Sequence, residues 1–446
     1  MNIKRAALGL VIAAALFSCA TARGAALAPK KAAPNTARAA FDNGMLFFER
    51  GDYGTAIECF TDALKLDPND ALAYGFRGDA YRSKEDYDRA IADLTQAVRL
   101  DPNDAFAYRS RGAAYYGKGD YDQAIEDSTQ AIKLDPNNAS AYNGRGAAYY
   151  GKGNYDQAVA DLTQAIKLDP NNASAYNGRG AAYYGKGNYD QAVADLTQAI
   201  RLDPNNAFAY RSRGVAYYGK GNYDQAIEDS TQAIKLDPNN ASAYNGRGAA
   251  YYGKGNYDQA VADLTQAIRL DPNNALAYYN RGNAYDSKGD YNRAIADFTQ
   301  ALKLDPNNAS AYGGRGATYF SKGDCDQAIT DLTQALKLDP NNASAYNNRG
   351  IAYAKKGDYD RALADYTQII RLDPNDAVAY YNRGSAYLSK GNERFTRRGT
   401  YYNRADAYHS KGDYDRAVAD FTQALRLDPN DASAQRGLET ARRRGR

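Results

Sequence analysis

The chain has 446 residues, too many for one ordinary hydrophobic core and enough for two or three globular domains. Its 56 Lys and Arg nearly balance 53 Asp and Glu, which argues against a dedicated nucleic-acid binder. A single histidine argues against most metal sites and against His-based catalysis, and three scattered cysteines cannot form a disulfide framework. We therefore expect no cofactor, no metal site and no enzymatic activity.

Residues 1–22 have the pattern of an export signal. Lys4 and Arg5 precede an apolar stretch, Ala6–Phe17, of twelve residues. Twelve residues are too few to span a bilayer as a helix, so this stretch is not predicted to be a transmembrane anchor. We expect an exported protein, either in the periplasm or anchored to an envelope membrane.

Two routes of maturation remain open. The segment Leu16-Phe17-Ser18-Cys19 resembles the lipobox of bacterial lipoproteins, which implies acylation of Cys19, although Phe17 replaces the small residue usual in that motif. The small residues of Ala20-Thr21-Ala22 would instead suit ordinary cleavage before Arg23. We favour acylation. Residues 23–36, rich in Ala, Pro and Lys, are predicted to be a flexible tether.

The remaining prolines reveal an internal repeat. They lie at positions 68, 102, 136, 170, 204, 238, 272, 306, 340, 374 and 429. The first ten are 34 residues apart, and the last step is 21 residues longer. A fixed period of this length indicates a solenoid that stacks one supersecondary unit.

Residues 139–172 show the pattern inside one unit. Aromatic and small residues recur at helical spacing over residues 140–152, and Gly153 then predicts a turn. Residues 155–168 carry apolar side chains on one helical face, and Pro170 ends this second helix because proline cannot continue it. Each unit is therefore predicted to be a helix–turn–helix hairpin.

This pattern resembles the tetratricopeptide repeat (TPR). The family has an aromatic residue at position 4, Gly at 8, Tyr at 11, Ala at 20 and 27, and Pro at 32; here these are Tyr142, Gly146, Tyr149, Ala158, Ala165 and Pro170. The resemblance extends over residues 37–431, with twelve units that start at 37, 71, 105, 139, 173, 207, 241, 275, 309, 343, 377 and 398. It implies an all-α, right-handed superhelical solenoid whose first helices line a concave face.

The predicted division has one irregularity. Ten units fill residues 37–376, a truncated unit follows at 377–397, and a last unit occupies 398–431. The truncated unit lacks thirteen residues of its second helix, so either the stack bends there or the last unit is a semi-detached end. Residues 432–446 are expected to form a capping helix and a basic tail.

Two charged positions depart from the family pattern. Position 7 is Arg in units two to twelve, and position 23 is Asp in units two to ten and in unit twelve. Because these positions lie level in an antiparallel hairpin, we predict an ion pair inside each unit, such as Arg179 with Asp195. The alternative is two unrelated, solvated charges.

A row of tyrosines marks the candidate binding surface. Position 12, which faces the concave groove in TPR folds, is Tyr116, Tyr150, Tyr184, Tyr218 and Tyr252 in units three to seven. Position 5 beside it is Arg109, Asn143, Asn177, Arg211 and Asn245, and position 13 is Gly in the same units. Rings and amides together can bury apolar side chains and bond to a peptide backbone. A duplicated surface without function is the alternative.

The other chemistry-bearing residues receive structural interpretations. The tyrosines at positions 4, 11 and 17 are assigned to packing, and His409, Cys59 and Cys325 to surface or packing roles. We therefore expect a protein–protein interaction scaffold of the bacterial cell envelope that holds a partner segment in the groove. The alternatives are an accessory subunit of an envelope assembly or a polysaccharide or pilus export machine, and a glycan or peptidoglycan binder.

Overall fold

The fold is all-α, as the sequence predicts. The computed structural model describes residues 36–396 and 404–445, and these ranges form 23 helices and no strand. The export signal, most of the tether and Cys19 lie outside the described residues, as do the side chains of residues 391–412, including His409. The chain divides between Gly253 and Lys254 into two compact bodies.

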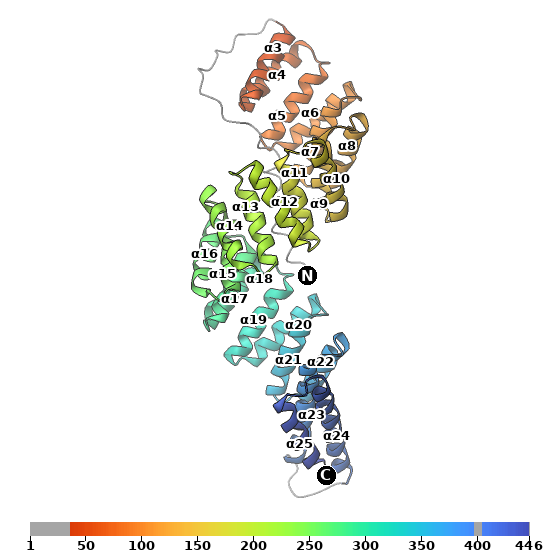
Figure 1. Ribbon diagram of the computed structural model, residues 1–446, viewed down its shortest axis with the longest axis vertical. Coiled ribbons are helices and arrows are strands. Elements are labelled where there is room, and N and C mark those ends of the chain that lie inside the picture. Colours follow the sequence, from red (N-terminus) through yellow and green to blue (C-terminus); the bar gives the residue numbers. More distant parts are fainter. Residues whose placement is uncertain (1–35, 397–403, 446) are drawn as a thin grey trace. The chain divides into compact units, whose positions relative to one another are not determined.

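The N-terminal body consists of consecutive antiparallel helices (Figure 1). They are α3 (Ala37–Glu49), α4 (Tyr53–Leu66), α5 (Ala71–Ser83), α6 (Tyr87–Leu100), α7 (Ala105–Lys118), α8 (Tyr121–Leu134), α9 (Ala139–Gly151), α10 (Tyr155–Leu168), α11 (Ala173–Gly185), α12 (Tyr189–Leu202), α13 (Ala207–Gly219), α14 (Tyr223–Leu236) and α15 (Ala241–Gly253).

The C-terminal body continues the same alternation up to its last helices. Its helices are α16 (Tyr257–Leu270), α17 (Ala275–Ser287), α18 (Tyr291–Leu304), α19 (Ala309–Lys322), α20 (Cys325–Leu338), α21 (Ala343–Lys355), α22 (Tyr359–Leu372), α23 (Ala377–Thr396), α24 (Arg404–Leu427) and α25 (Ala432–Arg444). In the part of the chain that the structure describes, no helix combines the length and apolar character needed to cross a membrane.

Local sequence sets the boundaries of each hairpin. In unit five the Asn172 side chain accepts a hydrogen bond from the Ala175 backbone N–H at 3.0 Å and begins α11. Gly187, with φ of 83°, makes the turn to α12, a conformation that favours glycine. Leu196 is buried in the hairpin, and a Cβ on Gly180 would lie 2.8 Å from its Cγ. Small residues thus bring the two helices into close contact.

The first and second helices of the units form two layers within each body. Every second helix packs on the first helix of the next unit, as α10 does on α11 and α18 on α19. The first helices also contact one another directly, from α5 through α7, α9, α11 and α13 to α15. Neighbouring second helices make no comparable contact among the described residues. The first helices therefore form the closer-spaced inner layer, and the second helices the outer one.

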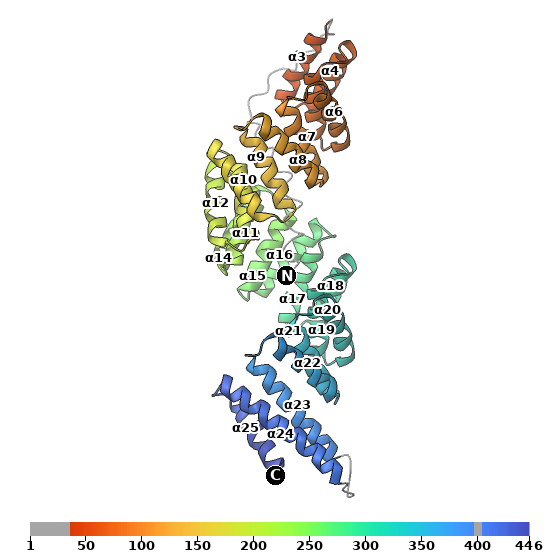
Figure 2. The ribbon, with the colours of Figure 1, turned by 90° about the vertical axis from the view of Figure 1, so that its right-hand side faces the viewer.

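The C-terminal end has a longer pairing than the other units. Helices α23 and α24 lie side by side as one long hairpin, with α25 packed against α24 (Figure 2). Arg383 donates to Asp420 from Nε and Nη2 at 2.9 and 2.8 Å, across 37 residues of sequence instead of the usual 16. The paired positions of this hairpin are therefore separated by 21 additional residues.

This arrangement corrects the pairing expected at the end of the array. The sequence pattern places Asp420 in the same unit as Arg404, but its partner is Arg383 of α23. Phe421 lies on the same side of α24 and packs its ring 5.9 Å from that of Tyr381. The side chains that hold α24 thus come from the unit expected to be truncated.

Candidate functional site

The predicted arginine–aspartate pair is confirmed in units two to six and eight to ten. In unit five, Nε and Nη2 of Arg179 donate to the two carboxylate oxygens of Asp195, each at 2.7 Å. The two side chains are 17% and 9% exposed. The same bidentate geometry joins Arg77–Asp93, Arg111–Asp127, Arg145–Asp161, Arg213–Asp229, Arg281–Asp297, Arg315–Asp331 and Arg349–Asp365. The hydrogen bond with Asp195 raises the pKa of Arg179.

A third hydrogen bond connects each arginine to the preceding unit. The Nη1 atom of Arg179 donates to Thr163 Oγ1 at 3.1 Å, and Arg213 makes the equivalent bond to Thr197 at 3.0 Å. Sequence analysis missed this contact, although Thr recurs at position 25 of the units. The arginines therefore hold both the hairpin and the junction between hairpins, and they are not available as a ligand site.

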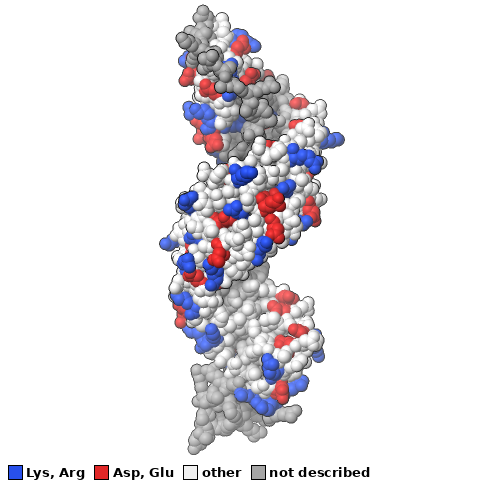
Figure 3. All heavy atoms as spheres, turned by 60° about the vertical axis from the view of Figure 1, so that its left-hand side comes forward, with Lys and Arg blue, Asp and Glu red and all other residues white. Residues whose placement is uncertain are grey.

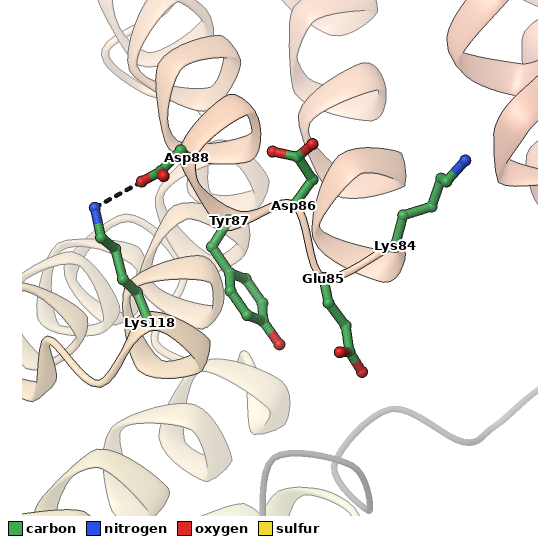
Figure 4. Close-up of a pocket in the computed structure, with 6 residues that line it drawn as sticks. All are labelled: Lys84, Glu85, Asp86, Tyr87, Asp88 and Lys118. Atoms are coloured by element: carbon green, nitrogen blue, oxygen red, sulfur yellow. Dashed lines mark hydrogen bonds and ion pairs between the residues drawn. The ribbon is translucent and has the colours of Figure 1, made fainter.

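A shallow surface hollow lies beside the turn of unit two. Figure 4 shows it lined by Lys84, Glu85, Asp86, Tyr87, Asp88 and Lys118. Lys118 donates to Asp88 at 2.6 Å, and Asp86 caps α6 by accepting from the Arg89 backbone. These polar groups serve a turn, a helix start and an exposed ion pair. In the ranges that the structure describes, no cluster of three or more His, Cys, Asp or Glu side chains could hold a metal ion.

The tyrosines of position 12 form a continuous row on the inner layer. In units three to six the ring packs against the position-17 tyrosine of its own unit, with centroids 5.5 to 5.7 Å apart, in the pairs Tyr116–Tyr121, Tyr150–Tyr155, Tyr184–Tyr189 and Tyr218–Tyr223. Neighbouring members also lie close enough to affect one another: both Tyr116 and Tyr184 contribute to the raised pKa of Tyr150.

The row is less open than the sequence predicts. Tyr116 and Tyr150 are only 8% and 9% exposed and belong to the hydrophobic core of their units. Tyr184 is half-buried, and Tyr218 is 39% exposed. Tyr218 makes the same contact with a position-17 ring as Tyr116 and Tyr150 do, so that contact alone does not determine how far a ring of the row is buried.

The glycines of position 13 serve packing between units. A Cβ on Gly185 would lie 2.6 Å from the ring of Tyr155 in the preceding unit, and Gly151 approaches Tyr121 in the same way. Each position-17 ring therefore lies between a tyrosine of its own unit and a glycine of the next. The position-13 glycines therefore let the first helix of each unit approach the position-17 tyrosine of the preceding unit closely. Their sequence position alone did not identify this role.

The residues at position 5 are largely buried on this inner layer. Asn143 and Asn177 are 8% and 3% exposed, and Arg211 is 3% exposed. Within the described residues, Asn143 Oδ1, both amide atoms of Asn177, and Nε and Nη2 of Arg211 have no hydrogen-bond partner. Arg109 and Asn245 are half-buried. Unpartnered buried polar atoms are rare in folded proteins, and the other described ones belong to Ser110, Ser212 and Asp286.

Burial perturbs the titration of this group. It raises the pKa of Tyr150 and raises that of Tyr184 to about 12. It lowers the pKa of Arg211 to about 10, and no carboxylate of a described residue lies close enough to offset the loss of water. The guanidinium carbon of Arg211 lies 4.9 Å from the centre of the Phe208 ring. The inner layer here combines aromatic rings, unpartnered amide atoms and one cation without a described counterion.

The remaining sequence-predicted residues have packing roles. Tyr142, Tyr149 and Tyr155, at positions 4, 11 and 17, are half-buried and pack against the core, as predicted. Cys59 is buried and Cys325 is half-buried. On the face in Figure 3, cationic and anionic side chains are interspersed rather than gathered by sign.

Comparison with known protein families identifies the repeat. Models described as TPR repeat or tetratricopeptide repeat match residues 41–105, 112–153, 148–187, 182–221, 216–255, 250–289, 275–308, 316–357, 343–376, 365–394 and 400–431. The chain belongs to the tetratricopeptide repeat family. The TPR fold is typical of protein–protein interaction scaffolds, and the solenoid of hairpins described above is the fold of this family.

One solved structure supports the fold. The chain is similar to one in the APC/C hetero-tetramer Cut9-Hcn1, with a TM-score of 0.50, 17% identity, and coverage of 91% of this chain and 96% of that one. It also matches YrrB, "a TPR protein with an unusual peptide-binding site" (TM-score 0.39, 25% identity, 48% and 100% coverage), and pilF of Pseudomonas aeruginosa (0.41, 24%, 45% and 92%). No curated protein matches the sequence.

Proposed function

We propose that this TPR protein is a non-enzymatic scaffold of the bacterial cell envelope that binds an extended segment of a partner protein along the inner layer of units three to seven. The observation that carries the proposal is that the Asn143 amide oxygen and both amide atoms of Asn177, beside the tyrosine row, are buried without a hydrogen-bond partner among the described residues. A peptide backbone offers the donors and acceptors that these amides lack, while its apolar side chains suit the rings.

The location in the cell is part of the same proposal. The apolar stretch at residues 6–17 and the lipobox-like Cys19 support export, followed by acylation of Cys19 or release into the periplasm. A scaffold held there would present its inner layer to other envelope proteins. An assembly or export machine of the envelope is one such setting.

Co-purification from crosslinked envelope fractions tests the proposal. The full-length tagged protein is compared with a Tyr184→Ala and Tyr218→Ala double variant, because these are the more exposed rings of the row. Phe320→Ala is the matched control, since it removes a ring from position 12 outside the row. We expect a discrete protein partner that the double variant loses and the control retains.

Other outcomes would contradict this site. A partner retained by the double variant would move binding away from the tyrosine row. Retention on peptidoglycan without any protein partner would instead show a glycan binder, since tyrosine rings also stack on sugars. Thermal melts of all three proteins show whether the loss of a partner reflects binding or unfolding.

A further inference from the structure

Two arginines of α13 have opposite surroundings. Arg213 donates to Asp229 at 2.8 Å and to Thr197 at 3.0 Å, so its charge is balanced. Arg211, two residues earlier on the same helix, is 3% exposed, and no residue in the described part of the chain bonds to its Nε or Nη2 atom. A buried, unpaired cation is costly to folding, because it has lost its water without gaining a counterion.

The equivalent residue of unit three shows how a counterion lowers this cost. Arg109 also occupies position 5 and lies over a phenylalanine ring, Phe106, at 5.1 Å. Asp79 and Asp104 lie near enough to favour its charged form, whereas burial lowers its pKa. Arg211 has no such carboxylate, and Tyr150 is the group that offsets its burial. The missing anion is therefore particular to Arg211.

The surface around Arg211 continues on both sides. On the N-terminal side, α11 contributes the unpartnered amide atoms of Asn177, and α9 contributes the unpartnered amide oxygen of Asn143. On the other side, Tyr218 lies about two turns further along α13, and the next first helix, α15, carries Asn245. An extended peptide that follows this row would pass Arg211 with its middle residues and continue past Arg211 on both sides. An acidic side chain within such a peptide, rather than its terminus, is placed to reach the guanidinium.

We propose that Arg211 binds the carboxylate of an internal aspartate or glutamate of the partner segment, while Asn143 and Asn177 bond to that segment's backbone. This inference rests on the proposed function, because it specifies the chemistry of the segment that the inner layer holds. A guanidinium–carboxylate contact is charge-assisted and bidentate, so it selects an acid over the corresponding amide. Arg211 thus determines which segments are accepted.

Selection from a random library of dodecapeptides with free C-termini tests the inference. The full-length protein is compared with Arg211→Gln, and Arg201→Gln, an exposed arginine of the outer helix α12, is the matched control. We expect the wild type and the control to enrich peptides with an internal Asp or Glu, and Arg211→Gln to lose that enrichment. A selected synthetic peptide should bind at least tenfold more weakly after Arg211→Gln or after its acid is changed to the amide, with little further loss when both changes are combined.

The outcomes separate this inference from the proposed function. If the wild type selects no peptide, the proposed function fails. If it selects peptides without acidic preference, the inference fails and groove binding stands. If selection depends only on the free C-terminus of the peptide, Arg211 binds the terminal carboxylate and not an internal side chain, and the inference also fails.

The stability of the free protein gives an independent readout. Arg211→Gln removes an unpaired buried cation, so it should raise the melting temperature. If Arg211 instead stabilised the fold, Arg211→Gln would lower the melting temperature, and that result would overturn the inference.

Discussion

Units four to six and units eight to ten contain the same hairpin and differ in what they present on the inner layer. Both carry the bidentate arginine–aspartate pair, as Arg179–Asp195 and Arg315–Asp331 show. At position 12, however, Tyr150, Tyr184 and Tyr218 are replaced by Asp286, Phe320 and Ala354. The contacts that build the solenoid are therefore maintained, whereas the surface proposed to bind a partner is specific to one region.

The same two regions differ in how their second helices begin. In units eight to ten an aspartate side chain caps the helix, accepting the backbone N–H of the residue three positions on; these caps are Asp290, Asp324 and Asp358. In units four to six the residue is Asn154, Asn188 or Asn222, and its side chain makes no capping bond. The near-identical middle units thus lack the stabilising capping hydrogen bond that the later units have at the start of the second helix.

Breaking the arginine–aspartate pair should have the largest effect, and an equal one in both regions. Arg179→Leu leaves the buried Asp195 carboxylate unpaired, which we expect to cost about 3 kcal/mol. Arg315→Leu should cost the same, because Asp331 is equally buried. Hydrogen exchange of the amides in each hairpin measures the local loss. Adding Asp195→Leu should recover much of it, and additive losses in that double-mutant cycle would show that the two charges do not interact.

Exchanging the caps should have a smaller effect, of opposite sign in the two regions. Asn188→Asp adds an anionic cap at the positive end of the α12 dipole and should stabilise unit five by about 0.5 kcal/mol. Asp324→Asn should destabilise unit nine by a similar amount. Local hydrogen exchange in α12 and α20 provides the measurement. Equal protection before and after both changes would show that the caps do not distinguish the regions.

Acid should have the smallest effect, and only in the aspartate-capped region. Hydrogen bonds from Arg293 lower the pKa of Asp290, and those from Arg361 lower that of Asp358. A lowered folded-state pKa means that the stabilisation is present above about pH 4 and is lost as pH falls through the folded-state value. Exchange protection at the starts of α18 and α22 should therefore fall between pH 5 and pH 2 relative to α10 and α12. A parallel fall in both regions would contradict this origin.

Sequence periodicity was sufficient to predict the hairpins and the ion pair inside each one. Positions 7 and 23 lie level in any antiparallel hairpin, so Arg179 and Asp195 could be paired without coordinates. The bond from Arg179 to Thr163 could not, because it depends on how one hairpin packs on the next. The burial of Tyr150 also depends on tertiary packing, because this side chain belongs to a hydrophobic core that combines residues of several units.

The end of the array shows a different limit of sequence analysis. Counting 34-residue units from residue 398 assigns Asp420 a partner at Arg404, and the pattern there is locally regular. Helix α24 instead runs from Arg404 to Leu427 without a turn, and its second half packs on α23 through Arg383. The repeated motif shows that Asp420 can accept an arginine at position 7 of a first helix. Tertiary structure determines which of the two candidate arginines, Arg383 or Arg404, becomes its partner.

The bond between each arginine and the threonine of the preceding unit makes the length of the array adjustable. If residues 173–206 were removed as a block, Arg213 would follow Thr163 at the distance in sequence that now separates it from Thr197. The new junction would therefore be chemically the same as the old one. Gain or loss of whole units during evolution needs no new interface, so a lineage can lengthen or shorten this protein in steps of 34 residues while every remaining joint keeps its chemistry.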